Sequence, residues 1–433
     1  GAAAARPGPA QRTLYRGSNP VGEECLRECR FALGRAAAEE VVRDATPWLD
    51  LWRDVFAFAA YRANEKLAAI HAAAGPRDGA VPLPAYLEAT ARAGLPLTLP
   101  GIPSLAHVAF REVKAAFAAA MAGRADAPSW TLGADDCAFL RRRLEVPRFD
   151  PFTYPCADLQ LAARAAADVA AGRHRWVLAE LHFPLVALQH GVHWACPDPA
   201  RFGAWTRAMA GGPFVDWGFL AGDVTNHTLL HLEALRDLWT YAGPGRVGPQ
   251  WHAVPPADVE VVLADGGDVR MRAGGRDLGS FARSWVLALG FHPFVLGLPR
   301  HTPRLVLGRT IVQRETWVLR REDLPHADRG LGAPELALDV DRLRAARAIP
   351  RHVYVRPTDE AVARLGAGGR DKDVKPVYLD LESYPFLDIL ARWMAKHGEL
   401  ELVEMLPGPE ELPWKEEDGS RTFEMRVFVA PRT

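Results

Sequence analysis

Residues 291–321 read FHPFVLGLPRHTPRLVLGRTIVQRETWVLRR, and the rest of the chain is interpreted around this stretch. An apolar loop with proline and glycine opens it, and three strand-forming groups follow, centred on Val306, Ile311 and Trp317. β-Branched and aromatic residues in short runs of this kind predict three β-strands. The arginines of the stretch are Arg300, Arg304, Arg309, Arg314, Arg320 and Arg321, and Glu315 is its only acid.

These arginines are expected to divide between the two faces of the predicted strands. Side chains alternate between faces along a strand, so Arg300, Arg304 and Arg314 would share one face and Arg309 would lie on the other, provided that no bulge intervenes. A guanidinium group is a planar fork of donors that suits phosphate and carboxylate. The stretch therefore predicts a rigid sheet surface that binds anions. The alternative is a solvated sheet face whose arginines pair with acids elsewhere in the fold.

The remainder of the chain predicts a helical first half and a strand-rich second half. Residues 1–40 are expected to form a flexible lead-in, residues 41–174 a mainly helical region and residues 175–433 an α+β region. Expected helices cover 47–74, 84–94, 104–123, 134–144, 157–172, 202–210, 225–241, 334–346 and 384–397. Expected strands cover 176–181, a meander from 258, 351–355, 376–381, 400–406 and 422–430, the last two completing one sheet. The predicted fold class is α+β with mixed and antiparallel sheets.

The composition limits the classes of function. The chain has 433 residues, of which 49% are hydrophobic and 24% charged, as in globular proteins that dissolve in water. Its net charge of −1 excludes a globally basic surface, so any contact with nucleic acid must come from a local patch. The longest uncharged run, residues 284–299, is too short to span a membrane. Five scattered cysteines argue for a reducing compartment, and we expect a cytoplasmic location.

The histidines of the middle region are the other candidates for chemistry. His190 and His193 follow the predicted strand at 176–181, but two histidines are half of a metal site at best, and we expect no metal. A packed histidine is the common outcome, and a base that deprotonates a Ser or Thr hydroxyl is the other option. The pair His227 and His231 lacks the HExxH order, and we interpret it as a helix face.

Four ordered segments resemble a known family. They are LAELHFPLVALQHGVHW at 178–194, PRLVLGRTIVQRETW at 303–317, PRHVYVR at 350–356 and KPVYLDLES at 375–383. Together they resemble the N-terminal, glutamylation-type domain of the lantibiotic dehydratase family, over most of residues 40–433. A β-rich portion that precedes this region in the family, and the elimination domain that often follows it, have no counterpart in the sequence. We therefore expect that the chain does not itself eliminate glutamate.

The resemblance implies transfer of glutamate from glutamyl-tRNA to Ser or Thr side chains of a ribosomally made precursor peptide, in lanthipeptide or thiopeptide maturation. It implies no cofactor, with glutamyl-tRNA as co-substrate. The implied partners are the precursor peptide, the aminoacylated tRNA and a separate elimination subunit, and a homodimer is also possible. The residues that we expect to hold the acyl group and its charge are Arg304, Arg309 and Arg314, with His193 as the base. Those expected to contact tRNA phosphates are Arg300, Arg320 and Arg321.

Two alternative functions fit the same sequence. One is the addition of an amino acid from aminoacyl-tRNA to the C-terminus of a peptide. The other is a noncatalytic peptide- or tRNA-binding subunit of a split dehydratase, in which an edge strand takes a leader peptide by strand addition. The sequence has no phosphate-binding loop and no dinucleotide glycine motif, so it gives no sign of ATP activation. The mass of the peptide product distinguishes an enzyme, which adds a glutamyl unit, from a binding subunit, which leaves the mass unchanged.

Overall fold

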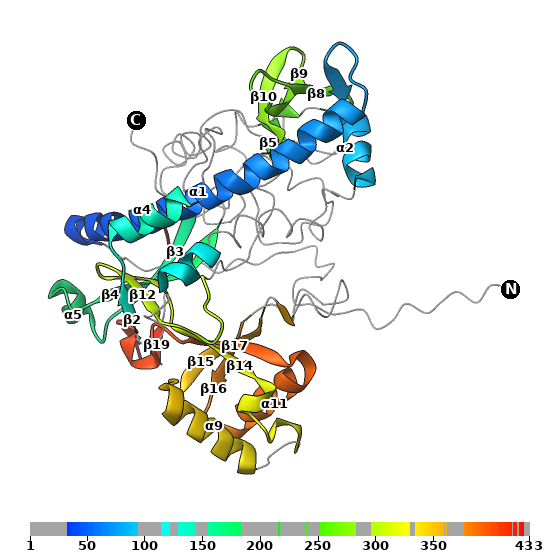
Figure 1. Cartoon of the computed structure of the whole chain (residues 1–433). Coiled ribbons are helices and arrows are strands. Elements are labelled where there is room, and N and C mark those ends of the chain that lie inside the picture. Colours follow the sequence, from blue (N-terminus) through cyan, green and yellow to red (C-terminus); the bar gives the residue numbers. More distant parts are fainter. Residues whose placement is uncertain are drawn as a thin grey trace.

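One long helix and two large sheets organise the chain (Figure 1). The computed structural model describes residues 33–93, 114–121, 129–143, 155–182, 215–216, 239–240, 252–253, 255–282, 296–329, 334–358, 360–361, 376–417, 419–421 and 424–427. Helix α1 (Arg35–Ala73) crosses the molecule, with a small meander sheet at one end and the six-stranded sheet near the other. The predicted α+β class is confirmed.

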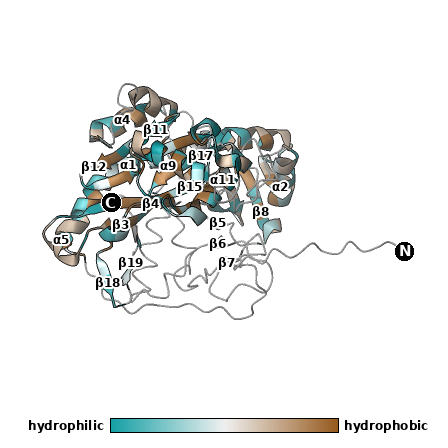
Figure 2. Ribbon diagram, turned by 90° about the horizontal axis from the view of Figure 1, so that it is seen from below, coloured by the Kyte–Doolittle hydropathy of each residue, from teal (hydrophilic) through white to brown (hydrophobic). Residues whose placement is uncertain are grey.

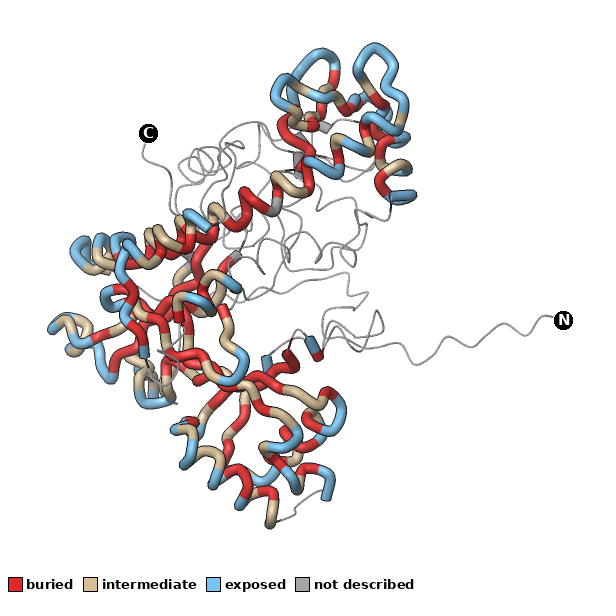
Figure 3. Tube along the Cα trace, in the orientation of Figure 1, coloured by how far each residue is buried: buried red, intermediate tan, exposed pale blue. Residues whose placement is uncertain are grey.

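Helix α1 begins well before the predicted start at Pro47, which lies inside it. Residues 35–40, assigned above to the flexible lead-in, are therefore helical, and that boundary was wrong. Large side chains before and after the proline explain the difference: Val41, Trp48, Leu49 and Trp52 are at most 3% exposed. Burying each such side chain is worth about 1.5–3 kcal/mol. Their sum exceeds the roughly 3 kcal/mol that an internal proline costs. Buried residues recur along the helix in Figure 3.

The six-stranded sheet carries the first two arginine-bearing strands and packs against α1. Its order is β2 (Ser129–Thr131), β12 (Arg304–Leu307), β13 (Thr310–Gln313), β4 (Arg175–His182), β3 (Cys156–Ala162) and β20 (Glu424–Val427). The pairs β2–β12 and β13–β4 are parallel and the others antiparallel. Helix α4 (Ala134–Arg142) packs on α1. Hydrophobic residues run along these strands and along α1 (Figure 2).

The helix predicted at 157–172 is wrong. Residues 156–162 form β3, and only the short helix α5 (Ala166–Ala170) follows. The alanines of this stretch favour a helix locally, but β3 is buried along nearly its whole length and pairs with a strand on each side. Burial on both faces and two ladders of hydrogen bonds override a weak local preference.

The five-stranded sheet is antiparallel and carries the third arginine-bearing strand. Its order is β11 (His301–Thr302), β14 (Thr316–Arg320), β17 (Glu399–Glu404), β15 (His352–Pro357) and β16 (Val377–Asp380). The predicted helices at 334–346 and 384–397 are confirmed as α9 (Pro334–Arg347) and α11 (Tyr384–His397), which share a hydrophobic core with this sheet. The predicted strands at 400–406 and 422–430 both exist, but they do not complete one sheet: β17 is central here, whereas β20 belongs to the six-stranded sheet.

The predicted meander is confirmed. Strands β8 (Val259–Leu263), β9 (Val269–Ala273) and β10 (Arg276–Ser280) form a sheet with β1 (Ala80–Pro82), which α2 (Leu83–Arg92) follows. The helix predicted at 225–241 is wrong at its end, where β6 (Trp239–Thr240) lies between β5 (Val215–Asp216) and β7 (His252–Ala253). Parallel pairing on both sides fixes that segment as a strand. Residues 114–121 of the helix predicted at 104–123 are helical, and the helix predicted at 202–210 lies outside the described residues.

Two further features concern the cellular environment. In the parts of the chain that the structure describes, no helix combines the length and apolar character that crossing a membrane requires. Cys137 and Cys156 are buried and form no disulfide. Burial raises the pKa of the Cys137 thiol to about 12, so this side chain is protonated at neutral pH.

The turn between β12 and β13 lies directly against α1. Gly308 has φ +57°, and a Cβ atom there would lie 2.2 Å from Oδ2 of Asp44 on α1. The same carboxylate oxygen accepts a hydrogen bond of 2.9 Å from the backbone N–H of Arg309. A side chain at position 308 would therefore push Asp44 away from the turn that it holds.

Gly308→Ala is expected to destabilise the fold by at least about 2 kcal/mol, because left-handed strain is combined with a clash against a bonded carboxylate. The free energy of unfolding in urea measures the effect. Gly275→Ala is the matched control: Gly275 has φ +79° and nothing within 4 Å of the added Cβ, so only the strain applies. Equal losses for the two variants would contradict the role given to Asp44.

Candidate functional site

The chain passes from the six-stranded to the five-stranded sheet through Arg314 and Glu315, which connect β13 to β14. A cavity of about 250 Å³ lies beside this crossing, with walls from α1 and from both sheets. The polar side chains in its wall are those of Gln160, Glu180, Gln313, Arg314, Thr316, Tyr354 and Arg356. A volume of this size suits one small polar group rather than a long ligand.

Arg314 is the notable charge of this cavity. Its Nη2 donates to the carbonyl of Leu406 (2.7 Å) and, over 3.4 Å, to Oε1 of Gln160. Its Nε is buried and has no hydrogen-bond acceptor. Among the described residues, no carboxylate forms an ion pair with Arg314. Desolvation lowers the pKa of this guanidinium from its ordinary value, but arginine remains charged at neutral pH. Because this buried charge has no ion pair with a described carboxylate, an anion that entered the cavity would stabilise it.

The neighbouring cation is already neutralised. Arg356 on β15 is 6% exposed, and its Nη2 lies 2.5 Å from Oε2 of Glu401 on β17. Tyr354, two residues earlier on the same strand, also lines the cavity. Gln313 exchanges two hydrogen bonds with the backbone of Leu296, which fastens the start of the arginine stretch to β13. Arg314 is therefore the cation of the cavity that can serve a ligand.

Arg304 has a structural partner. Its Nε donates to Oε1 of Glu404 (2.7 Å) and its Nη2 to Oε2, and Glu404 is 3% exposed. The hydrogen bond to Glu404 raises the pKa of Arg304. Glu404 also accepts the backbone N–H of Glu315 at 2.8 Å. The pair thus joins β12 of one sheet to β17 of the other at the point where the chain crosses.

The shared face predicted for Arg300, Arg304 and Arg314 is wrong. Arg300 precedes β11, Arg304 lies in the other sheet, and Arg314 lies in the crossing between the two sheets. A register shift between Leu305 and Val306 is the bulge that the prediction required to be absent. Alternation of faces holds only within one regular strand.

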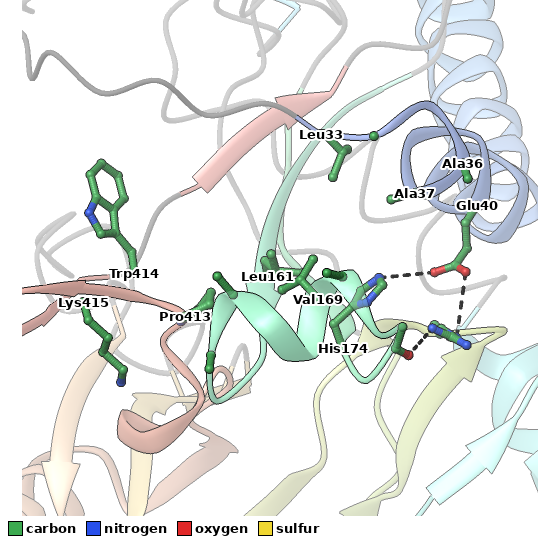
Figure 4. Close-up of a pocket in the computed structure, with 16 residues that line it drawn as sticks. Leu33, Ala36, Ala37, Glu40, Leu161, Val169, His174, Pro413, Trp414 and Lys415 are labelled. Carbon is green, nitrogen blue, oxygen red and sulfur yellow. Dashed lines mark hydrogen bonds and ion pairs between the residues drawn. The ribbon is translucent and has the colours of Figure 1, made fainter.

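Arg309 lies at the other end of β13 and lines a different cavity, of about 1090 Å³ (Figure 4). Its guanidinium donates to the carbonyl of Gly172, and its Nε is 3.8 Å from Oε2 of Glu40. Glu40 also approaches His174, with 3.4 Å between Oε1 and Nε2. Gln160 and Leu161 are consecutive in β3 and line the smaller and the larger cavity respectively, as expected for opposite faces of a strand.

The three arginines predicted to contact tRNA lie at the surface, each with an acidic partner. Arg300 pairs with Glu322 (3.4 Å), Arg320 with Glu399 (3.0 Å) and Arg321 with Asp328 (3.0 Å). Their side chains are 57%, 40% and 53% exposed. The exposed pairs of Arg300 and Arg321 contribute only about 0–1 kcal/mol, so phosphates can replace these carboxylates at little cost, whereas Glu399, the partner of Arg320, is 18% exposed.

The predicted base, His193, lies outside the described residues, as do His190, His227 and His231. Within the described ranges, no three His, Cys, Asp or Glu side chains are grouped as a metal ion requires.

Sequence reasoning missed several residues of the two cavities. Gln160 lies in the segment wrongly predicted as a helix at 157–172, and no sequence pattern distinguished Glu40 or His174. Glu180 did carry a signal, because it is the only acid in the apolar run at 176–181.

Comparisons with known proteins agree with this architecture. No family model matches the sequence, and no curated protein matches it. Among solved structures, the glutamylation domain TbtB from thiomuracin biosynthesis matches with a TM-score of 0.53 and 19% identity, over 90% of this chain and 50% of that one. The same domain bound to 5′-phosphodesmethylglutamycin matches with a TM-score of 0.54 and 20% identity, over 91% and 50%. The chain has the fold of a glutamylation domain.

The resemblance found in the sequence is thereby confirmed at the level of the fold. The chain spans about half the length of the TbtB chains. The tRNA-dependent lantibiotic dehydratase MibB from Microbispora sp. 107891 matches with a TM-score of 0.44 and 17% identity, over 68% of this chain and 30% of that one.

Proposed function

We propose that the chain transfers a glutamyl group from glutamyl-tRNA to a Ser or Thr side chain of a ribosomally made precursor peptide. The observation that carries the proposal is Arg314, a guanidinium in a small inter-sheet cavity that forms no ion pair with any described carboxylate. The glutamylation-domain fold supports the class of reaction, since the relatives in thiomuracin biosynthesis are named for it. A glutamyl group carries one side-chain carboxylate, which is the anion that Arg314 lacks.

The reaction makes few demands on the protein. The hydroxyl oxygen of the acceptor attacks the ester carbonyl of glutamyl-tRNA, a new ester bond forms, and the bond to the terminal ribose oxygen breaks. The ribose hydroxyl leaves with the proton that the acceptor hydroxyl gives up. Because the ester is already activated, neither ATP nor a cofactor enters the scheme. The chain must hold the acyl group, stabilise negative charge on the carbonyl oxygen and move one proton.

Arg314 would hold the glutamyl carboxylate through its fork of donors, and His193 is the proposed base. Arg304 and Arg309 take positioning roles in this scheme: Arg304 through its bond to Glu404 at the crossing, and Arg309 through its contacts with Gly172 and Glu40. Arg300, Arg320 and Arg321 would bind tRNA phosphates in place of their present carboxylate partners.

Mass spectrometry of a precursor peptide incubated with this chain and glutamyl-tRNA tests the proposal, with and without the proteins encoded beside it. The expected product is the peptide with one or more glutamyl groups on Ser or Thr, formed without ATP. Fragmentation locates the modified residue, so an amino acid found at the peptide C-terminus would favour the alternative addition reaction. A peptide of unchanged mass in every mixture would reject transferase activity, and a noncatalytic binding subunit would be the remaining hypothesis.

A further inference from the structure

Among the described residues, two side chains in the wall of the larger cavity have buried polar atoms without a hydrogen-bond partner. The His174 side chain is only 4% exposed, and neither its Nδ1 nor its Nε2 has a hydrogen-bond partner. Oε1 of Glu40 is also buried and lacks one. The 3.4 Å contact between Glu40 and His174 is an ion-pair approach without hydrogen-bond geometry. Each unsatisfied buried atom costs about 1–3 kcal/mol, so a ligand group that formed hydrogen bonds with these atoms would recover part of that cost.

The chemistry of these atoms selects the ligand group. A carboxylate only accepts hydrogen bonds, whereas a neutral imidazole has one donor and one acceptor nitrogen. A hydroxyl or a carboxamide both donates and accepts, so it can satisfy Glu40 and His174 together. Arg309 and Lys415 also line the cavity, but a carboxylate or phosphate placed against His174 would face Oε1 of Glu40, which repels it.

The walls select the rest of the ligand. Ala36 and Ala37 on α1, Leu161 on β3 and Ala166 and Ala170 on α5 all line the cavity (Figure 4). Trp414 of β18 (Trp414–Glu416) closes the end far from Glu40. Small apolar walls leave room for apolar side chains of a ligand. The volume of about 1090 Å³ is at the upper end for a small-molecule site, and several peptide residues fit in it.

We propose that this cavity binds a peptide segment that places a Ser, Thr, Asn or Gln side chain against Glu40 and His174 and apolar side chains against the alanine walls. The proposal rests on the proposed function for its choice of a peptide as partner. The site is separate from the Arg314 cavity, because the two lie on opposite faces of β3. It would hold the precursor peptide at a distance from the residue being modified.

A peptide-retention experiment tests this site without any transfer reaction. The immobilised chain is incubated with two mixtures of acetylated, amidated hexapeptides that have apolar residues at varied positions. The third position is Ser in one mixture and Ala in the other. Mass spectrometry of the retained peptides is expected to show enrichment of the Ser mixture. Ala166→Trp, on the exposed side of α5, should fill the cavity and abolish retention of both mixtures.

Two further variants make the test specific. Ala167→Trp, on the same short helix but outside the cavity wall, should leave retention unchanged. His174→Phe keeps a ring in the core but removes both unsatisfied nitrogens, so it should erase the preference for Ser while the fold keeps or gains thermal stability. The proposal fails if the Ser and Ala mixtures are retained equally, or if Ala166→Trp has no effect. The chain could instead retain deacylated tRNA and no peptides. If Ala166→Trp abolished that retention, the cavity would be a nucleic-acid site and the proposal would be wrong.

The two proposals fail separately. Arg314→Met is expected to leave peptide retention unchanged, because Arg314 does not line this cavity. Peptide retention without glutamyl transfer would reject the proposed function alone. If the chain retains no peptides, and Ala166→Trp does not change the rate of glutamyl transfer, the peptide site alone is rejected.

Discussion

Replacing Arg314 by methionine is expected to lower kcat/KM for glutamyl transfer by about 10²–10³-fold, the effect of removing one essential donor from a buried anion site. The same change should leave the free energy of unfolding unchanged or raise it. Arg314 forms no ion pair with a described carboxylate and donates only to a carbonyl and an amide, so a neutral side chain of similar length removes a desolvation cost. Lost activity with retained stability is the signature of a residue kept for its ligand.

Three measurements make this result specific to the glutamyl carboxylate. Arg314→Lys keeps a charge but loses the fork of donors, and we expect it to recover only part of the rate. Arg321→Met removes an exposed arginine of the same stretch and should change tRNA binding rather than the bound acyl group. The wild-type chain should prefer glutamyl-tRNA to glutaminyl-tRNA, and Arg314→Met should lose that preference. Full transfer by Arg314→Met would show that the acyl group is held elsewhere.

Arg304→Ala should have the largest effect on stability, a loss of about 3–5 kcal/mol. The reason is its partner: Glu404 is 3% exposed, and without Arg304 this buried carboxylate would keep the backbone N–H of Glu315 and lose its cation. The two sheets would then lose the ion pair that joins β12 to β17. Arg300→Ala removes the exposed pair with Glu322 and should cost only about 0–1 kcal/mol. Urea unfolding of both variants measures the difference.

The double variant Arg304→Met, Glu404→Gln separates the structural role of Arg304 from a catalytic one. Glutamine keeps an acceptor for the N–H of Glu315 and carries no charge, so most of the lost stability should return. If Arg304 is only structural, glutamyl transfer returns as well. Restored stability with transfer still lost would instead support the direct role that the sequence predicts for Arg304.

Much of the fold follows from local sequence patterns. The three arginine-bearing strands, the meander around Gly266 and Gly274 and the helices α9 and α11 all lie close to their predicted positions. In each case the turn residues and the apolar spacing act within a few residues of one another, and tertiary packing agrees with them. Where the two disagree, packing decides: α1 continues through Pro47, and the alanine-rich residues 156–162 form a strand.

The candidate site could be predicted only in part, because the fate of an arginine depends on distant residues. The sequence by itself determined that arginines would be concentrated on these strands, and that one or more could bind an anion. Only the tertiary structure decided that Arg304 meets Glu404, 100 residues away, while Arg314 meets a carbonyl 92 residues away. Alternation within a strand is a local property of the backbone, whereas the neutralisation of a charge depends on which strands the fold brings together. Within the stretch 300–321, Arg314 is the arginine that pairs with no described carboxylate, and it is the residue from which we infer the function.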